Sequence, residues 1–102
     1  MAHASFKRRH NVTLTSGDYS YSPSSVGAAA QSAQTMTVKG IRLNDTYTLN
    51  LPSTGTGSIT LLLTHHYISA ADTITMVFFN TDVGAHTPST PTAADPYVVS
   101  VN

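Results

Sequence analysis

Hydrophobic and polar residues alternate most clearly within residues 67–80, which hold the densest run of apolar and β-branched side chains. Ile74, Met76 and Phe78 form one set of alternate positions. The intervening set is Thr73, Thr75, Val77 and Phe79. A period of two is typical of a β-strand, because successive side chains point to opposite faces of a sheet. Since both sets include apolar residues, we expect a central strand that is covered on both faces near its end.

Shorter segments show the same alternation and end at turn-forming residues. The predicted strands are residues 11–15, 19–22, 33–38, 41–43, 46–51, 59–63 and 97–101, with an extended continuation over 65–69. Loops are expected at 23–32, 53–58 and 81–94, and a tight turn at 70–72. About seven to eight short strands with turns between them predict an all-β fold. We expect a single antiparallel β-sandwich or jelly-roll-like domain over residues 11–102.

The first ten residues precede this pattern and contain a basic cluster of Lys7, Arg8 and Arg9. One interpretation is an arm, residues 1–10, that docks on an acidic surface. The alternative is a solvated terminus in which the charges cluster by chance. Three basic residues are too few to indicate a nucleic-acid partner.

Composition indicates a protein whose surface is packed against others. Only 10% of the 102 residues are charged, against roughly 25% in an ordinary soluble domain. The five acidic residues are all aspartate, and the formal net charge is zero. Threonine and serine supply most of the polar surface. Because a small domain without cysteine has no disulfide to stabilise it, we expect stabilisation by self-association.

No targeting or membrane segment is expected. The first ten residues lack the apolar stretch of a signal peptide. No apolar run approaches the roughly 20 residues that span a bilayer.

Candidate catalytic and metal-binding patterns are weak. His65 and His66 are adjacent, so on a strand they face opposite sides and do not share a metal. A shared site requires His86, an aspartate or a symmetry-related copy; ordinary hydrogen bonding is the favoured interpretation. The sequence has no G-x-S-x-G, its aspartates lie in expected turns, and the loop 53–58 has no following lysine. We therefore expect no enzyme activity, no cofactor and no metal.

Four tyrosines raise a carbohydrate-binding hypothesis. Tyr19, Tyr21, Tyr47 and Tyr67 offer rings on which a sugar can stack. Such residues more often cover sheet edges or fill interfaces, where both the apolar ring and the hydroxyl are used.

Three segments resemble a pattern of small β-structured virion proteins of tailed phages. They are GIRLNDTYTLNLP at 40–52, YISAADTITMVFFNT at 67–81 and DPYVVSV at 95–101. In such proteins a G-x-x-x-x-D-T turn leads into a strand closed by proline. Next comes a strand with the D-T-v-T pattern. A proline-containing loop and a final strand led by an aromatic residue come after it. This chain departs from the pattern at Asn44, where glycine is common, and at His65-His66.

The resemblance implies a structural component of a phage particle, made in the host cytoplasm. One expectation is a head decoration (cement) protein on the capsid surface, typically a homotrimer bound to the major capsid protein. The alternative is a tail-fibre or spike module, or a carbohydrate-binding β-sandwich, that contacts a host surface. The short chain without repeats or a coiled coil favours the decoration protein.

Interface residues follow from this hypothesis as expectations. The arm residues Phe6, Lys7, Arg8 and Arg9, together with the loop 83–92, are the candidates for capsid binding. The candidates for contact with a neighbouring molecule are Thr73, Thr75, Val77 and His86.

Overall fold

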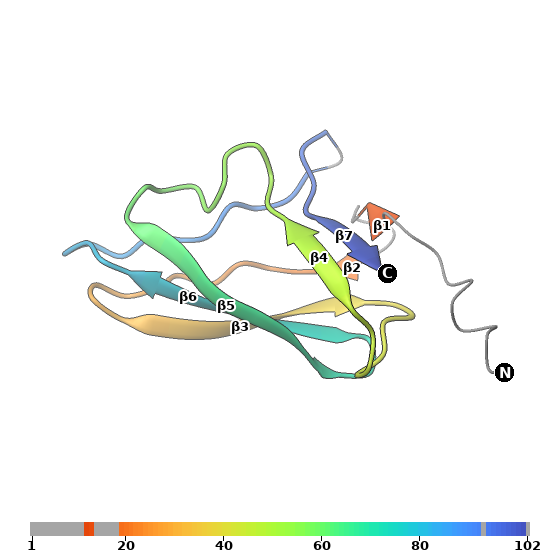
Figure 1. Ribbon diagram of the computed structural model, residues 1–102. Coiled ribbons are helices and arrows are strands. Elements are labelled where there is room, and N and C mark those ends of the chain that lie inside the picture. Colours follow the sequence, from red (N-terminus) through yellow and green to blue (C-terminus); the bar gives the residue numbers. More distant parts are fainter. Residues whose placement is uncertain (1–11, 14–18, 93, 102) are drawn as a thin grey trace, which may run out of the picture.

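The computed structural model describes residues 12–13, 19–92 and 94–101, and this part of the chain consists of two antiparallel sheets without a helix (Figure 1). The strands are β1 (Val12–Thr13), β2 (Tyr19–Ser20), β3 (Gln31–Val38), β4 (Tyr47–Asn50), β5 (Leu61–Ala70), β6 (Thr73–Asn80) and β7 (Val98–Val101). The all-β prediction is confirmed. The predicted sandwich of seven to eight strands is not confirmed, since β1 and β2 are two-residue pairings and five strands are longer. The described residues include no helix long and apolar enough to cross a membrane.

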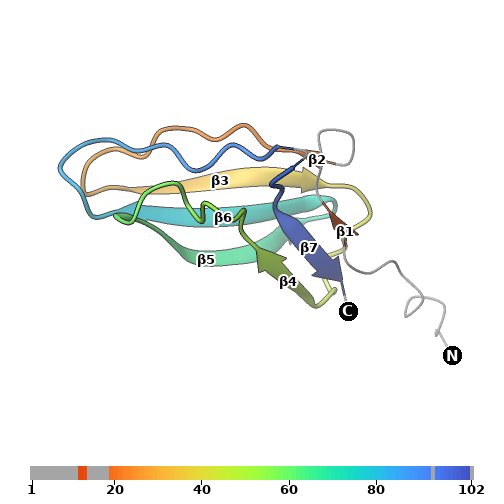
Figure 2. The same cartoon turned by 90° about the horizontal axis from the view of Figure 1, so that it is seen from above.

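β6 is one of the two inner strands of the larger sheet, which agrees with the predicted central position. The sheet orders are β2-β3-β6-β5 and β1-β7-β4. Figure 2 shows β3, β6 and β5 side by side, with β4 and β7 crossing one end of this layer. Ile74, Met76 and Phe78 are fully buried, whereas Val77 and Phe79 on the opposite face are half-buried. The period of two in the sequence therefore identified the core face of β6 correctly.

One apolar core is shared by both sheets and by the loops between them. Tyr21 and Tyr97 meet edge to face in this core, with ring centroids 5.5 Å apart. This T-shaped arrangement is one that aromatic pairs favour. The buried apolar residues are Tyr21, Val26, Met36, Val38, Ile41, Leu61, Ile74, Met76, Phe78, Tyr97, Val99 and Val101.

Two predicted strand segments need correction. Residues 41–43 form a turn, in which the Asp45 carboxylate accepts a hydrogen bond from the Arg42 backbone N–H at 2.8 Å. This local hydrogen bond offers the backbone an alternative to a strand. Residues 61–63 and 65–69 belong to one strand, β5 (Leu61–Ala70), which has a register shift between Leu63 and His65, and residues 59–60 form a turn before it. The expected loop 23–32 is also shorter, because β3 begins at Gln31.

The turn between β5 and β6 depends on Asp72. Its φ of 64° lies in the left-handed region, which aspartate tolerates better than most residues. The Asp72 carboxylate accepts the Gly40 N–H at 2.8 Å, and its carbonyl accepts the Val38 N–H at 2.8 Å. Asp72 therefore fixes the hairpin and also joins it to the end of β3.

The loop after β6 runs beside the segment that precedes β3 (Figure 2). Val26 and His86 exchange two backbone hydrogen bonds, of 2.7 and 3.0 Å. A loop of this length is uncommon in a compact domain, and long loops are often functional. This loop is held in place by pairing with another part of the chain.

Candidate interaction surfaces

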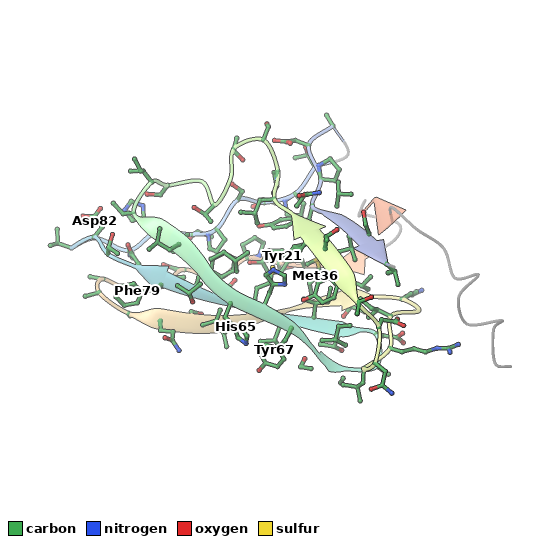
Figure 3. The ribbon with its side chains drawn as sticks, in the orientation of Figure 1. Tyr21, Met36, His65, Tyr67, Phe79 and Asp82 are labelled. Carbon is green, nitrogen blue, oxygen red and sulfur yellow. The ribbon has the colours of Figure 1, made fainter. Side chains whose placement is uncertain are left out.

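The outer face of the larger sheet is the surface turned away from the core. Its side chains come from β3 (Gln31, Ala33, Thr35, Thr37), β6 (Thr73, Thr75, Val77, Phe79) and β5 (Leu62, His65, Tyr67). None of these positions holds aspartate, lysine or arginine. Figure 3 shows His65 and Tyr67 on the side of β5 away from β4. An antiparallel sheet with one solvated face usually carries polar residues there, so the apolar members of this set indicate a contact surface.

Apolar side chains gather on the β5–β6 half of the outer face. Leu62 lies opposite Phe79, and His65 lies opposite Val77. Leu62 remains 46% exposed and Tyr67 43% exposed. The Tyr67 ring stacks on the His65 ring, with centroids 5.0 Å apart and planes 29° from parallel. We call Leu62, His65, Tyr67, Val77 and Phe79 the outer-face patch.

Three of the four residues predicted to contact a neighbouring molecule lie on this face. Val77 belongs to the patch, and Thr73 and Thr75 precede it along β6. Thr75 is only 6% exposed, and its hydroxyl donates to Ser69 Oγ at 2.7 Å. His86 lies elsewhere, on the loop after β6. The structure therefore groups the three β6 residues and separates His86 from them.

His86 contacts Asp82 within its own loop. Its Nε2 lies 2.7 Å from Asp82 Oδ2. This hydrogen bond, with a second from the Val83 backbone N–H, lowers the pKa of Asp82 below its usual range. The contact stabilises the loop conformation. The predicted capsid-binding loop 83–92 begins at this pair.

The two adjacent histidines face opposite sides of β5, as predicted. His66 points towards β4, where its Nδ1 lies 2.6 Å from the Tyr47 hydroxyl, while His65 stacks on Tyr67. Burial lowers the pKa of His66, and the nearby His65 lowers it further. Among the described residues, no group of three or more histidine, aspartate or glutamate side chains is placed to hold a metal ion.

The tyrosines do not form the shared sugar-stacking surface that the sequence suggested. Tyr21 is buried in the core, and burial, followed by Tyr97, raises its pKa well above the ordinary value. Tyr47 is half-buried against His66, and Tyr67 lies on the outer face. The side chain of Tyr19 lies outside the described part. Tyr47 and Tyr67 lie on different strands, and Tyr21 lies in the segment after β2, so the three rings reach different parts of the molecule.

Aspartates act in turns, as expected. The Asp95 carboxylate also reaches a distant segment, where it accepts the Ser53 backbone N–H at 2.7 Å and the Ser53 hydroxyl at 2.8 Å. These two hydrogen bonds lower the pKa of Asp95. Asp72 and Asp45 likewise accept backbone N–H groups. Asp45 therefore acts within its own turn, whereas Asp72 and Asp95 connect their turns to distant segments of the chain.

Sequence reasoning missed an exposed apolar tip at one end of the larger sheet. Ile59 is 95% exposed and Val83 is 93% exposed. Both lie beside the point where Thr81 N–H donates to the Thr60 carbonyl at 2.9 Å, so they share one end of the β5–β6 pair. A pocket lined by residues 54–59, Leu61 and Leu62 adjoins it. We call Ile59 and Val83 the apolar tip.

A local signal for part of the tip was present in the sequence. Val83 stands alone between Asp82 and Gly84 in an expected loop, where an apolar side chain has no strand to join. Ile59 belongs to the predicted strand 59–63, and its exposure follows from the later start of β5.

Comparison with protein-family models, curated proteins and solved structures finds no match. The predicted arm residues Phe6, Lys7, Arg8 and Arg9 lie outside the described residues.

Proposed function

We propose that this chain is a non-enzymatic structural protein of a tailed-phage particle, a head decoration (cement) protein that binds the assembled capsid. In this proposal the two sheets are the layers of a jelly-roll-like β-sandwich, and three copies assemble on the capsid surface. The observation that carries the proposal is the apolar tip, whose two aliphatic side chains are almost fully exposed. The phage assignment itself comes from the sequence resemblance.

The tip suits attachment to another protein. Burying a Val or Ile side chain contributes about 1.5–3 kcal/mol. That contribution becomes available when a partner covers Ile59 and Val83. In a trimer, three tips engage one capsid at once, and multivalent attachment raises the overall affinity without a new kind of contact. The loop that carries Val83 is held by the Asp82–His86 pair, so little ordering is needed on binding.

Capsid co-sedimentation tests the proposal. The capsid to use is that of the phage whose genome encodes the chain, and a gene position beside the major capsid gene supports the choice. We expect the protein to sediment with assembled capsids and to saturate at a fixed number of copies. No binding to these capsids would contradict the proposed function.

Variants locate the attachment surface. Ile59→Ser combined with Val83→Ser should weaken capsid binding by at least about tenfold, since ~1.4 kcal/mol corresponds to a factor of ten. Leu43→Ser is the matched control, because Leu43 is 60% exposed in the turn between β3 and β4. If Leu43→Ser weakened capsid binding as much as the double substitution, the apolar tip would be excluded as the attachment surface. Replacing Lys7, Arg8 and Arg9 by serine tests the arm in the same assay.

A tail-fibre or carbohydrate-binding module is the second candidate. The specific observation that favours it is the exposed ring pair of Tyr67 and His65 on an uncharged sheet face. Aromatic rings with polar neighbours suit ligands that have apolar faces and hydroxyl groups. Binding on a glycan array that is lost in Tyr67→Ala, without capsid binding, would support this candidate over the decoration protein.

A further inference from the structure

The outer face lacks a covering layer among the described residues. The smaller sheet and the loops that follow β2 and β6 lie on the core side of the larger sheet (Figures 1 and 2). Burying apolar surface contributes a favourable free energy of about 25 cal/mol for each Å² removed from water. The outer face does not gain this free energy while it stays in contact with water. The outer-face patch spans two neighbouring strands, so this apolar surface is continuous.

The patch also borders a free sheet edge. β5 is the last strand of its sheet and is ten residues long. It contains no proline, aspartate, lysine or arginine, which are devices that commonly protect an edge strand. The register shift after Leu63 is the protective feature that it does have. Leu62, His65 and Tyr67 of the patch all belong to this strand.

Charge distinguishes the possible occupants of this surface. The charged residues Lys39, Arg42, Asp45, Asp72, Asp82 and Asp95 all lie in turns and loops, and none of them occupies an outer-face position. A partner with a charged surface would lose hydration here and gain no counter-charge, which is costly. An identical outer face brings apolar side chains against the patch and threonine hydroxyls that can form hydrogen bonds with each other.

We propose that a second copy of this chain packs its own outer face against the outer-face patch, so that the larger sheets lie inside the oligomer. The proposal deepens the proposed function, because it names the surface through which the decoration protein self-associates and leaves the apolar tips free for the capsid. A closed ring of three copies, with the three outer faces turned towards its axis, satisfies both proposals.

Solution mass measured over a range of concentrations tests this inference. Sedimentation equilibrium of the full chain should give a multiple of the monomer mass. Leu62→Lys and Thr35→Lys each place a charge at an exposed outer-face position, on β5 and β3 respectively. Each should weaken self-association by at least about tenfold, because a buried charge without a partner is costly. Thr48→Lys is the control, at an exposed position on β4 of the other sheet.

The outcomes separate this inference from the proposed function. A melting curve for each variant establishes that it is folded. A wild-type chain that stays monomeric at every concentration overturns the inference, as do variants whose mass matches that of the wild type. A monomer that still binds capsids would reject the self-association surface and leave the decoration function standing. If the wild-type chain is an oligomer that Leu62→Lys dissociates, but it does not bind capsids, the self-association surface would stand and the decoration function would be rejected.

Discussion

Asn80, at the end of β6, joins three parts of the chain through one buried amide. Its Nδ2 donates to the carbonyls of Val26 at 3.1 Å, Gly27 at 3.2 Å and Gly84 at 2.8 Å. Its Oδ1 accepts the Asp82 backbone N–H at 3.0 Å. Because the side chain is fully buried, water cannot replace these hydrogen bonds. This single residue holds the loop of the apolar tip onto the sheet.

Asn80→Ala should lower the free energy of unfolding by about 2–3 kcal/mol, because it removes a fully buried amide that donates to three carbonyls and accepts the Asp82 backbone N–H. Chemical denaturation measures this change. Asn50→Ala, at an exposed position on β4, is the matched control and should change stability by less than about 0.5 kcal/mol. Equal effects of the two substitutions would show that the amide does not hold the loop.

His66 makes stability depend on pH. Its lowered pKa means that the folded protein binds this proton less readily than the unfolded chain. Stability is therefore complete above the unfolded value, about 6.5, and decreases as the pH falls from there towards the lowered folded pKa. We expect the melting temperature to fall between pH 7.5 and pH 5.5, and His66→Gln to reduce that fall. A variant with an unchanged pH profile would rule out His66 as its source.

At the scale of elements, the β5–β6 hairpin organises the larger sheet. β6 pairs with both β3 and β5, and its turn is tied to β3 through Asp72. The hydroxyl of Tyr47 on β4 reaches His66 on β5, so the same hairpin also contacts the smaller sheet. A change in the hairpin turn should therefore affect both sheets.

Asp72→Ala should destabilise the protein by about 1–2 kcal/mol, since alanine loses the acceptor for Gly40 N–H and is strained at positive φ. Asp72→Asn should cost less than about 0.5 kcal/mol, because asparagine tolerates this conformation and keeps an acceptor oxygen. Thermal unfolding of both variants at pH 7 distinguishes them. If asparagine proved as damaging as alanine, the turn geometry would not explain the role of Asp72.

The whole molecule combines a small apolar core with a surface of low charge. Within the described part of the chain, twelve buried apolar side chains form that core. The outer-face patch and the apolar tip place further apolar groups in contact with water. A small domain gains less from its own core than a large one, so covering these surfaces in an oligomer adds stability. Stability and assembly are linked in this interpretation.

The melting temperature should therefore rise with protein concentration, because only the folded chain presents the outer face to a second copy. Differential scanning calorimetry over a hundredfold range of concentration measures the effect. The melting temperature of Leu62→Lys should depend less on concentration than that of the wild type, because this variant associates more weakly. An oligomer whose melting temperature is constant over the same range would contradict this linkage.

Local alternation by itself determined much of this protein. The core face of β6, the opposite orientations of His65 and His66 and the absence of helix from the described residues all follow from side chains that alternate along a strand. Turn chemistry predicted the role of Asp45 correctly, because its carboxylate accepts the backbone N–H of Arg42, three positions away. Each of these features depends on interactions within a few positions of the chain.

Tertiary structure alone decided which parts meet across long distances in the sequence. The pairing of Asn80 with Val26, of Ser53 with Asp95 and of Tyr47 with His66 each joins residues at least 19 positions apart. The exposure of Ile59 depends on where β5 begins, and that start is set by pairing with β6. A pattern of period two fixes the side that a residue faces. Only the packed chain fixes what lies on that side, because the contacts that cover it come from distant segments.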